Sequence, residues 1–485
     1  MSEASRIRKN SLFSFFSMSS RLITNIIIYW IIARYYGREI FGQFTSAQTI
    51  AIALILFADF GLDLLLTTEL PRDIKNSVTL FNNFFSIKII FSSIAFLAMI
   101  LLGLFGRLIP EVKTLLLIFS FFVVFTTLSN FLSALYKGNE KLEYETFVNF
   151  IINFSSLIVI LTLIFLKQNI IVLSVAFTFT KFIGLVSAFY FAHKLISLKN
   201  LRIDFSFFPK YKNQIIIFGL FWVFGNLFFQ LDTILLTFWS NTENVGVYQA
   251  VFRLIMLPLV IPDIFVNSLM PTLSRLNSEN RIKWEKLGNI FNKLLIIVAV
   301  PISISLFIFP EQVIHLVYGR KEYADAIPIL KVFAVILFIR FFSETHGLML
   351  TTSHRQNQRM KIVLAATILN FVINLFLIPR FGAFGASITS LITNFSVCIL
   401  YIISTSPVIF DWVKEWKIFQ FLFLVICLAV VGYIFRYLNL WLVFALPFVF
   451  YLVAAYKLVL SSTEKKYFSE MEFLTKFVWL KKMLA

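Results

Sequence analysis

Long apolar stretches separated by short polar turns run through the chain from residue 12 to residue 459. Most are close to the length of about 20 residues that lets a helix cross about 30 Å of hydrocarbon. The pattern predicts fourteen transmembrane helices, at 12–33, 43–68, 79–105, 112–136, 146–166, 169–192, 214–239, 246–272, 287–309, 326–351, 358–378, 383–405, 415–435 and 438–459. The expected fold class is therefore an all-α polytopic membrane protein, in which no turn is long enough to hold a soluble domain.

The composition supports this fold and predicts how the chain is oriented across the membrane. The 485 residues are 59% hydrophobic and only 14% charged, which excludes an ordinary soluble protein. A net charge of +18 would indicate nucleic-acid binding in a soluble protein, but here the basic residues gather in the tails and in alternate turns. The positive-inside rule then predicts both termini in the cytoplasm, and it explains the positive charge without a nucleic-acid partner. The first apolar run is too long for a signal peptide, so we expect a retained helix.

Two pairs of similar segments indicate an internal repeat. Residues 39–44 before the second helix resemble residues 243–248 before the eighth, and Asn149–Asn153 matches Asn370–Asn374. Two six-helix lobes related by a pseudo-two-fold axis along the membrane normal follow from this order. The predicted division is an N-lobe at 1–192, a basic linker at 193–213, a C-lobe at 214–406, two further helices at 407–460 and an amphipathic tail at 461–485.

Each predicted half carries an aspartate on its second helix and a lysine on its third. Asp59 and Lys88 are nearly equidistant from the turn between their helices and are expected at similar depth, and the same holds for Asp263 and Lys293. An unpaired charge inside the membrane is costly, so an Asp–Lys pair is expected in each half. Such pairs either tie neighbouring helices together or exchange a partner for H⁺ or Na⁺ during transport. Asp63, one turn further on, is expected to snorkel to the cytoplasmic surface.

A second arrangement of charges surrounds the turn at 241–244. Asp232 and Arg253 lie at similar depth on either side of it and are expected to face each other. Pro258 and Pro262 follow on the same helix, where a structural pair and a breakable contact of a moving helix are both reasonable. The residues assigned to ion coupling or gating are Asp59, Asp232, Asp263, Lys88 and Lys293.

Other cations lie deep in the predicted helices. Arg21 is about 15 Å along the first helix and Lys181 is near the middle of the sixth, whereas Arg340 can interact with Glu344 four residues on. Cations that face a water-filled cavity would suit an anionic ligand such as a phosphate or pyrophosphate. The residues assigned to substrate binding are Arg21, Lys181, Arg253 and Arg340.

The sequence predicts no catalytic or metal site. The four histidines are scattered, and the chain has no Walker motif, nucleotide loop or Ser/His/Asp arrangement. A membrane glycosyltransferase or polysaccharide polymerase would need a large outward loop, and the longest expected one is only residues 310–325. We therefore expect a transporter without a cofactor, unless the coupling ion is counted as one.

Several short motifs resemble those of polysaccharide biosynthesis transporters. They are Ala33–Gly37 with Gly42, Asp59–Leu62 with Glu69–Arg72, Leu231–Asp232 with Gly246–Tyr248, and Ile378–Ala386. The pattern is similar to the Wzx-type O-antigen flippases of the multidrug/oligosaccharidyl-lipid/polysaccharide exporter superfamily. That resemblance implies a V-shaped pair of lobes, alternating access and a central cationic cavity built from helices 1, 2, 7 and 8. Arg21 and Arg253 would contact the pyrophosphate or the sugar.

The resemblance also implies a substrate and leaves alternatives within the superfamily. The implied substrate is an undecaprenyl-pyrophosphate-linked oligosaccharide, moved from the cytoplasmic to the periplasmic leaflet and coupled to H⁺ or Na⁺. The expected partners are this lipid-linked substrate, membrane lipids and the polysaccharide polymerase and chain-length machinery, with the protein itself a monomer. A lipid II flippase and a multidrug/cation antiporter remain the alternatives, the latter requiring acidic cavity residues for cationic drugs.

Overall fold

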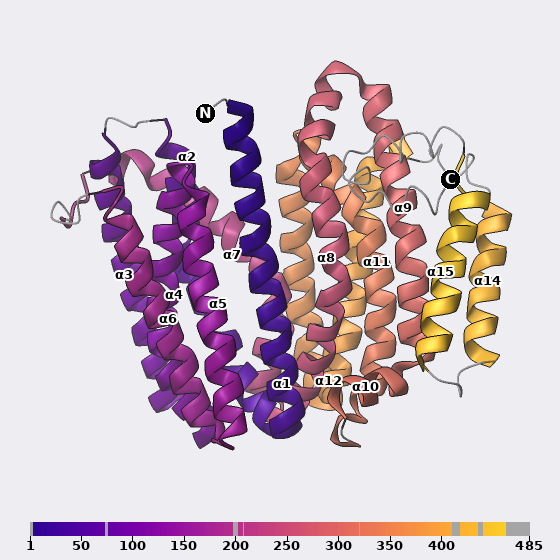
Figure 1. The fold of residues 1–485 in the computed structure, drawn as a ribbon, viewed down its shortest axis with the longest axis horizontal. Coiled ribbons are helices and arrows are strands. Elements are labelled where there is room, and N and C mark those ends of the chain that lie inside the picture. Colours follow the sequence, from indigo (N-terminus) through magenta and orange to yellow (C-terminus); the bar gives the residue numbers. More distant parts are fainter. Residues whose placement is uncertain are drawn as a thin grey trace. The chain divides into compact units, whose positions relative to one another are not determined.

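In the computed structural model the chain is built from helices joined by short connections (Figure 1). The structure describes residues 3–72, 76–196, 202–206, 208–319, 321–409, 418–434 and 440–461. The helices are α1 (Glu3–Asp59), α2 (Leu62–Glu69), α3 (Ser77–Phe105), α4 (Pro110–Gly138), α5 (Leu142–Phe165), α6 (Ile170–Ala192), α7 (Phe208–Trp239), α8 (Thr242–Glu279), α9 (Arg281–Ile308), α10 (Pro310–Tyr318), η3 (Lys321–Tyr323), α11 (Ala326–Thr352), α12 (Gln356–Ile409), α14 (Ile418–Ile434) and α15 (Leu440–Leu458).

The predicted spans reappear in these helices, which confirms the all-α polytopic fold. Two long helices each hold two predicted segments, because α1 is broken at Gly37 and α12 at Gly382. Both glycines have a positive φ, 80° and 53°, a conformation that glycine adopts without the steric cost of a Cβ atom. Among the described residues, ten helices are long and apolar enough to cross a membrane. The chain is a multi-pass membrane protein.

The structure corrects the prediction in two places. The expected continuous helix 43–68 is broken, since Phe60 and Gly61 have φ of 42° and 73° between the end of α1 and the start of α2. The expected loop at 310–325 contains α10 and a 3₁₀ turn. Of the amphipathic tail predicted at 461–485, residues 462–485 lie outside the described residues.

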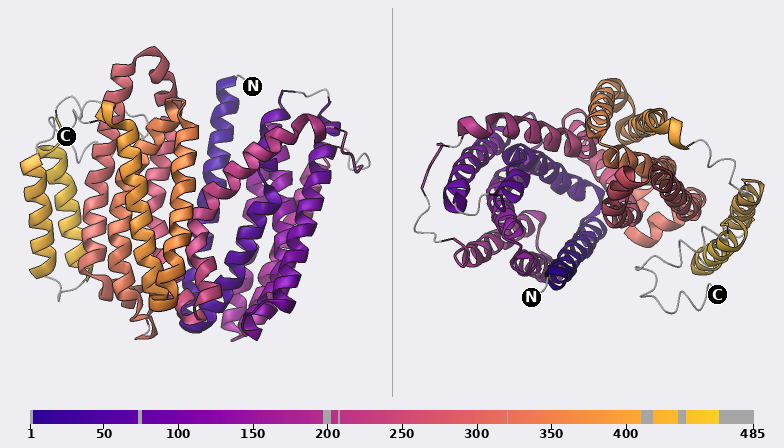
Figure 2. Two further views of the ribbon diagram at one scale, coloured as in Figure 1. Left: turned by 180° about the vertical axis from the view of Figure 1, so that it is seen from behind. Right: turned by 90° about the horizontal axis from the view of Figure 1, so that it is seen from above.

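The chain divides into two compact units. The first contains residues 1–253 and 370–386, and the second contains residues 254–369 and 387–485. Buried apolar side chains of α2, α3 and α4 form the core of the first unit, together with residues of α5, α6 and α7. In the second unit, α14 and α15 run side by side and pack on α9 (Figure 2). The predicted lobe boundaries at 192 and 214 stay a prediction.

Contacts within the first unit support the internal repeat. A Cβ atom on Gly42 would lie 1.8 Å from the Thr242 carbonyl oxygen, and one on Gly246 would lie 1.8 Å from the Arg38 carbonyl oxygen. The two repeat-related glycines therefore let α1 and α8 cross backbone to backbone. Gly42 meets Thr242 and Gly246 meets Arg38, and Thr242 and Arg38 are equivalent positions in the predicted repeat. Arg38 also forms an ion pair with Glu243 at 2.9 Å across this crossing.

The two asparagine pairs occupy equivalent places as well. In the first half, Asn149 and Asn153 of α5 donate to Ser17 and Ser20 of α1 at 2.8 and 3.2 Å. In the second half, the matching pair on α12 donates to Asp232 of α7. Each pair thus binds the first helix of its own half, as a duplicated fold requires.

Candidate functional site

Asp232 is a buried carboxylate that accepts hydrogen bonds from asparagine and tyrosine side chains. Asn370 and Asn374 of α12 donate from Nδ2 to its Oδ1 at 2.9 and 2.7 Å. Tyr248 of α8 donates from its hydroxyl to Oδ2 at 2.7 Å, and all four side chains are buried. These donors supply the hydrogen bonds that a carboxylate buried away from water requires.

The same cluster holds an oxygen with no partner. The side-chain oxygen Oδ1 of Asn374 is buried and has no hydrogen bond within the described part of the chain. Rotation of that amide would place a carbonyl oxygen where its NH₂ group now meets the Asp232 carboxylate. Carboxylate and amide oxygens are the ligands that hard cations prefer. The cluster is therefore chemically suited to exchange amide donors for a small cation.

Contrary to the prediction, Arg253 does not face Asp232. Its guanidinium lies over the ring of Tyr29 with Cζ 3.7 Å from the ring centroid, and its Nε donates to Gln249 at 3.2 Å. Gln249 in turn donates to Thr233, and the Tyr29 hydroxyl donates to Gln48. The guanidinium is held by an aromatic face and an amide, so a cation–π contact replaces the expected ion pair.

Asp59 and Lys88 form the predicted pair, and Asp63 joins it. The Lys88 ammonium lies 2.8 Å from Asp59 Oδ1 and 2.7 Å from Asp63 Oδ1. The Lys88 side chain is fully buried, with 7% of the Asp59 side chain and 21% of the Asp63 side chain exposed. The expected snorkelling of Asp63 is thus wrong, because the break at Phe60 and Gly61 turns α2 so that its first turn meets the ammonium.

The second half does not repeat this pair. Asp263 of α8 has Glu344 and Arg340 of α11 as its charged neighbours, and no ion pair joins it to Lys293 among the described residues. Lys293 is buried in α9. The Asp263 side chain is exposed on a segment of α8 that also contains Pro258 and Pro262. The predicted contact between Asp263 and Lys293 is therefore wrong, although both residues lie in the second unit.

Glu344, which lies near Asp263 and Arg340, also interacts with a cation of α12. It lies 3.8 Å from Arg359, whose Nη1 donates to Thr351 at 2.9 Å and whose guanidinium interacts electrostatically with Tyr401. One turn from the same region, the ring of His346 is buried between Asn292 and Thr405. The second unit thus contains a polar interior built from α8, α9, α11 and α12.

The two cations assigned to a cavity have different surroundings. Arg21 of α1 is exposed and forms no ion pair with any described residue, as expected for a cation that meets solvent or a ligand. Lys181 of α6 instead places its ammonium 4.8 Å from the ring centroid of Phe177 and 5.9 Å from that of Phe122. Two aromatic faces therefore stabilise Lys181. Its assignment to substrate binding, like that of Arg21, stays a prediction.

The family is decided by comparison with known proteins. A family model described as a polysaccharide biosynthesis protein matches residues 7–277, more than half of the chain. The chain belongs to the polysaccharide biosynthesis protein family. A second model, MatE, matches residues 218–377.

Relatives of this polysaccharide biosynthesis protein point the same way. A putative O-antigen transporter of Escherichia coli is 23% identical over 80% of this chain and 94% of its own length. An uncharacterised membrane protein of Methanocaldococcus jannaschii is 24% identical over 74% of this chain and 76% of its own. The protein is accordingly a flippase or transporter of the multidrug/oligosaccharidyl-lipid/polysaccharide exporter superfamily, and its relatives are transporters rather than enzymes. Such flippases act on lipid-linked substrates among membrane lipids.

Solved structures share the fold. A lipid II flippase in an inward closed conformation covers 92% of this polysaccharide biosynthesis protein and 99% of its own chain, with a TM-score of 0.74 and 16% identity. An inward-facing multidrug transporter of the same superfamily covers 81% and 96%, with a TM-score of 0.64 and 14% identity. At these identities the likeness concerns the fold alone.

Sequence reasoning missed several site residues of this family member. Asn370 and Asn374 were noticed only as part of a repeat, although a polar pair four residues apart on an apolar helix already indicates one buried polar face. Tyr248 was named only as part of a repeat and a motif, and neither indicated that its hydroxyl donates to Asp232. Arg359 and Tyr401 were also missed, since each lies where a side chain can snorkel to the surface.

Proposed function

We propose that the protein moves an undecaprenyl-pyrophosphate-linked oligosaccharide, a repeat unit of O-antigen or another surface polysaccharide, across the bacterial inner membrane. In this proposal both termini are cytoplasmic, the protein acts as a monomer, and the substrate passes by alternating access from the cytoplasmic to the periplasmic leaflet. Polysaccharide polymerase and chain-length machinery then receive it. The family match over residues 7–277 is the observation that carries this proposal.

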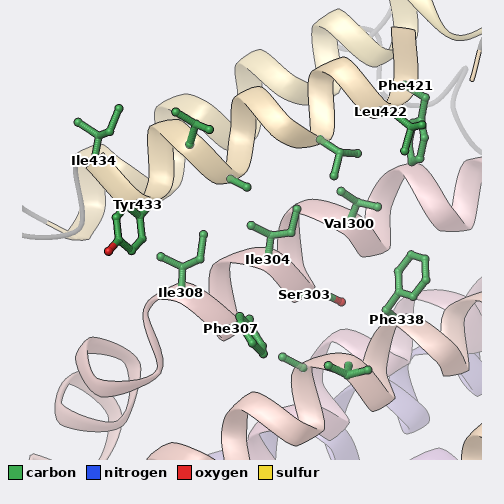
Figure 3. Close-up of a pocket in the computed structure, with 15 residues that line it drawn as sticks. Val300, Ser303, Ile304, Phe307, Ile308, Phe338, Phe421, Leu422, Tyr433 and Ile434 are labelled. Atoms are coloured by element: carbon green, nitrogen blue, oxygen red, sulfur yellow. The ribbon is translucent and has the colours of Figure 1, made fainter. Parts of the chain in front are cut away.

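An apolar pocket in the second unit supports a substrate with a long hydrocarbon chain. It has a volume of about 730 Å³ and lies between α9, α11 and α14 (Figure 3). Ile304, Phe338 and Phe421 are among the residues that line it, and Ser303 points a hydroxyl toward it. The lining side chains other than Ser303 and Tyr433 are apolar, and they would hold a polyprenyl tail by van der Waals contact within the membrane. We assign the tail to this pocket.

The head group of the substrate needs polar and cationic partners. Arg21 is exposed, and Arg253 is fixed on Tyr29 with further guanidinium donors available. A guanidinium binds phosphate oxygens in a bidentate manner, and an aromatic ring stacks on a sugar face. We assign pyrophosphate and sugar contacts to these residues, with Arg340 and Lys181 as the weaker assignments because neighbouring residues already hold them.

Transport against a concentration difference requires coupling to an ion. We assign ion coupling to Asp232, because its buried carboxylate and the unpartnered Asn374 oxygen offer ligands for H⁺ or Na⁺. Asp263 and Lys293 remain gating candidates in the second unit. An ion bound at Asp232 would alter the hydrogen bond that Tyr248 of α8 donates to it.

Complementation tests the proposed function. The protein is expressed in a strain that lacks its own O-unit flippase and carries a panel of glycan loci, and surface polysaccharide is measured. Restoration by at least one locus is expected, with a large loss for Asp232→Asn at equal membrane abundance. If no locus is restored by the wild-type protein while it is present in the membrane, the O-unit assignment is wrong. Rescue of a strain depleted of its lipid II flippase would assign lipid II as the substrate instead.

A further inference from the structure

Three ionisable side chains meet where α1 gives way to α2. The Lys88 ammonium contacts one oxygen of Asp59 and one of Asp63, at 2.8 and 2.7 Å. Oδ1 of Asp59 also accepts the backbone amide of Asp63 at 3.1 Å. A single ammonium is therefore shared by two carboxylates in the interior of an apolar bundle.

The charges of this cluster do not balance. With both carboxylates ionised and the ammonium charged, the cluster carries one excess negative charge. A buried excess charge is strongly unfavourable in a low-dielectric interior. A neighbouring cation could cancel it, or one of the carboxylates could take up a proton.

The helices packed around the cluster do not supply that cation. The ring of Phe131 on α4 covers the Lys88 ammonium at 5.7 Å from the ring centroid. Lys137, on the same helix, pairs with Glu145 of α5 at 3.1 Å. From α6, Lys181 lies over two phenylalanine rings.

The next charged groups lie at the end of α2 and at the start of α7, where the Lys210 ammonium is 5.1 Å from the ring centroid of Tyr211. Glu69 pairs with Arg72 at 2.8 Å and accepts a hydrogen bond from Tyr211 of α7 at 3.5 Å. Where α7 reaches the break, its residues are Phe218 and Gly219, which carry no charge. Among the described residues, the excess charge of the cluster thus has no second cation to neutralise it.

The geometry favours a proton over a metal ion. The position between the two carboxylates is already taken by the Lys88 ammonium, so Na⁺ could bind only by displacing a buried charge. A proton needs no such space and leaves both contacts to the ammonium in place. Asp63 is the more accessible carboxylate, with 21% of its side chain exposed against 7% for Asp59.

We propose that the cluster of Asp59, Asp63 and Lys88 is a proton-binding site of this transporter, with the proton carried by Asp63. The proposal rests on the proposed transport function, for which it names the coupling ion at this site. Lys88 stays charged and bound to Asp59 in both states. No bond other than the O–H bond of the Asp63 carboxyl group forms or breaks.

The position of the cluster gives proton uptake a mechanical consequence. Asp59 and Asp63 flank the break, and the Phe60 ring occupies the space left by Gly219 of α7, where a Cβ atom would lie 2.1 Å from the ring. Gly61 likewise lies against the backbone of Phe218. A change in the contact between Lys88 and Asp63 therefore affects the packing of the break against Phe218 and Gly219 of α7, the first helix of the second half.

Infrared titration of the purified full-length protein tests this proposal directly. A protonated carboxyl group absorbs at a C=O frequency that is separate from those of the carboxylate. The wild type should show such a band at neutral pH and lose it as the pH rises. Asp63→Asn should lose the amplitude of one carboxyl group, whereas the linker variant Asp204→Asn should keep it. Asp63→Glu should keep the band and shift its frequency.

Two results would overturn the proposal. One is the absence of any protonated carboxyl band in the wild type at neutral pH, and the other is a band whose amplitude Asp63→Asn leaves unchanged and whose frequency Asp63→Glu leaves unshifted. The glutamate variant retains both the charge and the reach to Lys88, so it answers the question if the asparagine variant fails to fold. The titration needs no substrate, and its outcome is therefore independent of whether any glycan locus is complemented.

Discussion

Adding a single methyl group at the crossing of α1 and α8 is a sharp test of the architecture. Gly42→Ala places a Cβ atom 1.8 Å from the Thr242 carbonyl oxygen, and Gly246→Ala places one 1.8 Å from that of Arg38. Neither oxygen can rotate away, because both belong to helix backbones. Real Cβ atoms keep 3.0 Å or more from such atoms, so the helices must separate by roughly 1.2 Å.

The cost of this separation can be worked out. Overpacking a well-packed site costs about 1–3 kcal/mol, and a backbone contact belongs at the upper end. Alanine returns about 1 kcal/mol through its higher helix propensity. Each variant should therefore lose about 2 kcal/mol net, as estimated from these two terms. The double variant should lose less than the sum, because one separation of the helices relieves both contacts.

Thermal unfolding in detergent, followed by tryptophan fluorescence at one scan rate, measures these losses. Gly225→Ala is the matched control, since a Cβ atom on Gly225 would have nothing within 4 Å. That variant should keep or slightly raise the unfolding midpoint. If Gly42→Ala and Gly246→Ala behave like Gly225→Ala, or if their effects add fully, α1 and α8 do not cross as described.

Two further predictions concern single contacts. Arg253→Lys should lower the free energy of unfolding by about 1–2 kcal/mol, because lysine cannot stack a planar group on Tyr29. A double-mutant cycle with Tyr29→Leu measures the coupling between the two side chains. Full additivity of the two substitutions would contradict this prediction. In the linker before α7, the backbone amide and hydroxyl of Ser206 hold the pKa of Asp204 below its ordinary value. The stabilisation from this carboxylate should be complete above about pH 4 and disappear as the pH falls through the lowered value, so the difference in unfolding midpoint between wild type and Asp204→Asn should vanish in acid.

The fold followed from the sequence because hydrophobic length determines which segments can cross a membrane. The predicted spans match the helices, and two broken helices hold a pair of predicted spans each. The break at Phe60 and Gly61 escaped prediction, since one glycine in an apolar run is only a weak signal of a helix end. The residue before that glycine is a phenylalanine at positive φ, which its packing against α7 maintains.

The candidate site followed only in part, because distance from a turn gives depth but not direction around a helix. Depth correctly paired Asp59 with Lys88. The same reasoning placed Asp232 opposite Arg253, although these side chains point toward different neighbours. Each residue of a helix turns the side chain by about 100°, so an error of one residue in a boundary is enough to change the partner. Asp263, whose charged neighbours lie on α11, shows the same limit.

The meeting of Gly42 with Gly246 also bears on the ancestry of the chain. A residue close to a two-fold axis meets its own equivalent, which is the arrangement of a homodimer formed by a half-length protein. Fusion of two such copies would preserve this contact while freeing each copy to diverge. The first copy now holds two aspartates on one lysine, and the second directs its corresponding aspartate elsewhere. The Gly42–Gly246 crossing thus keeps a symmetric contact between two segments of the chain whose buried charges differ.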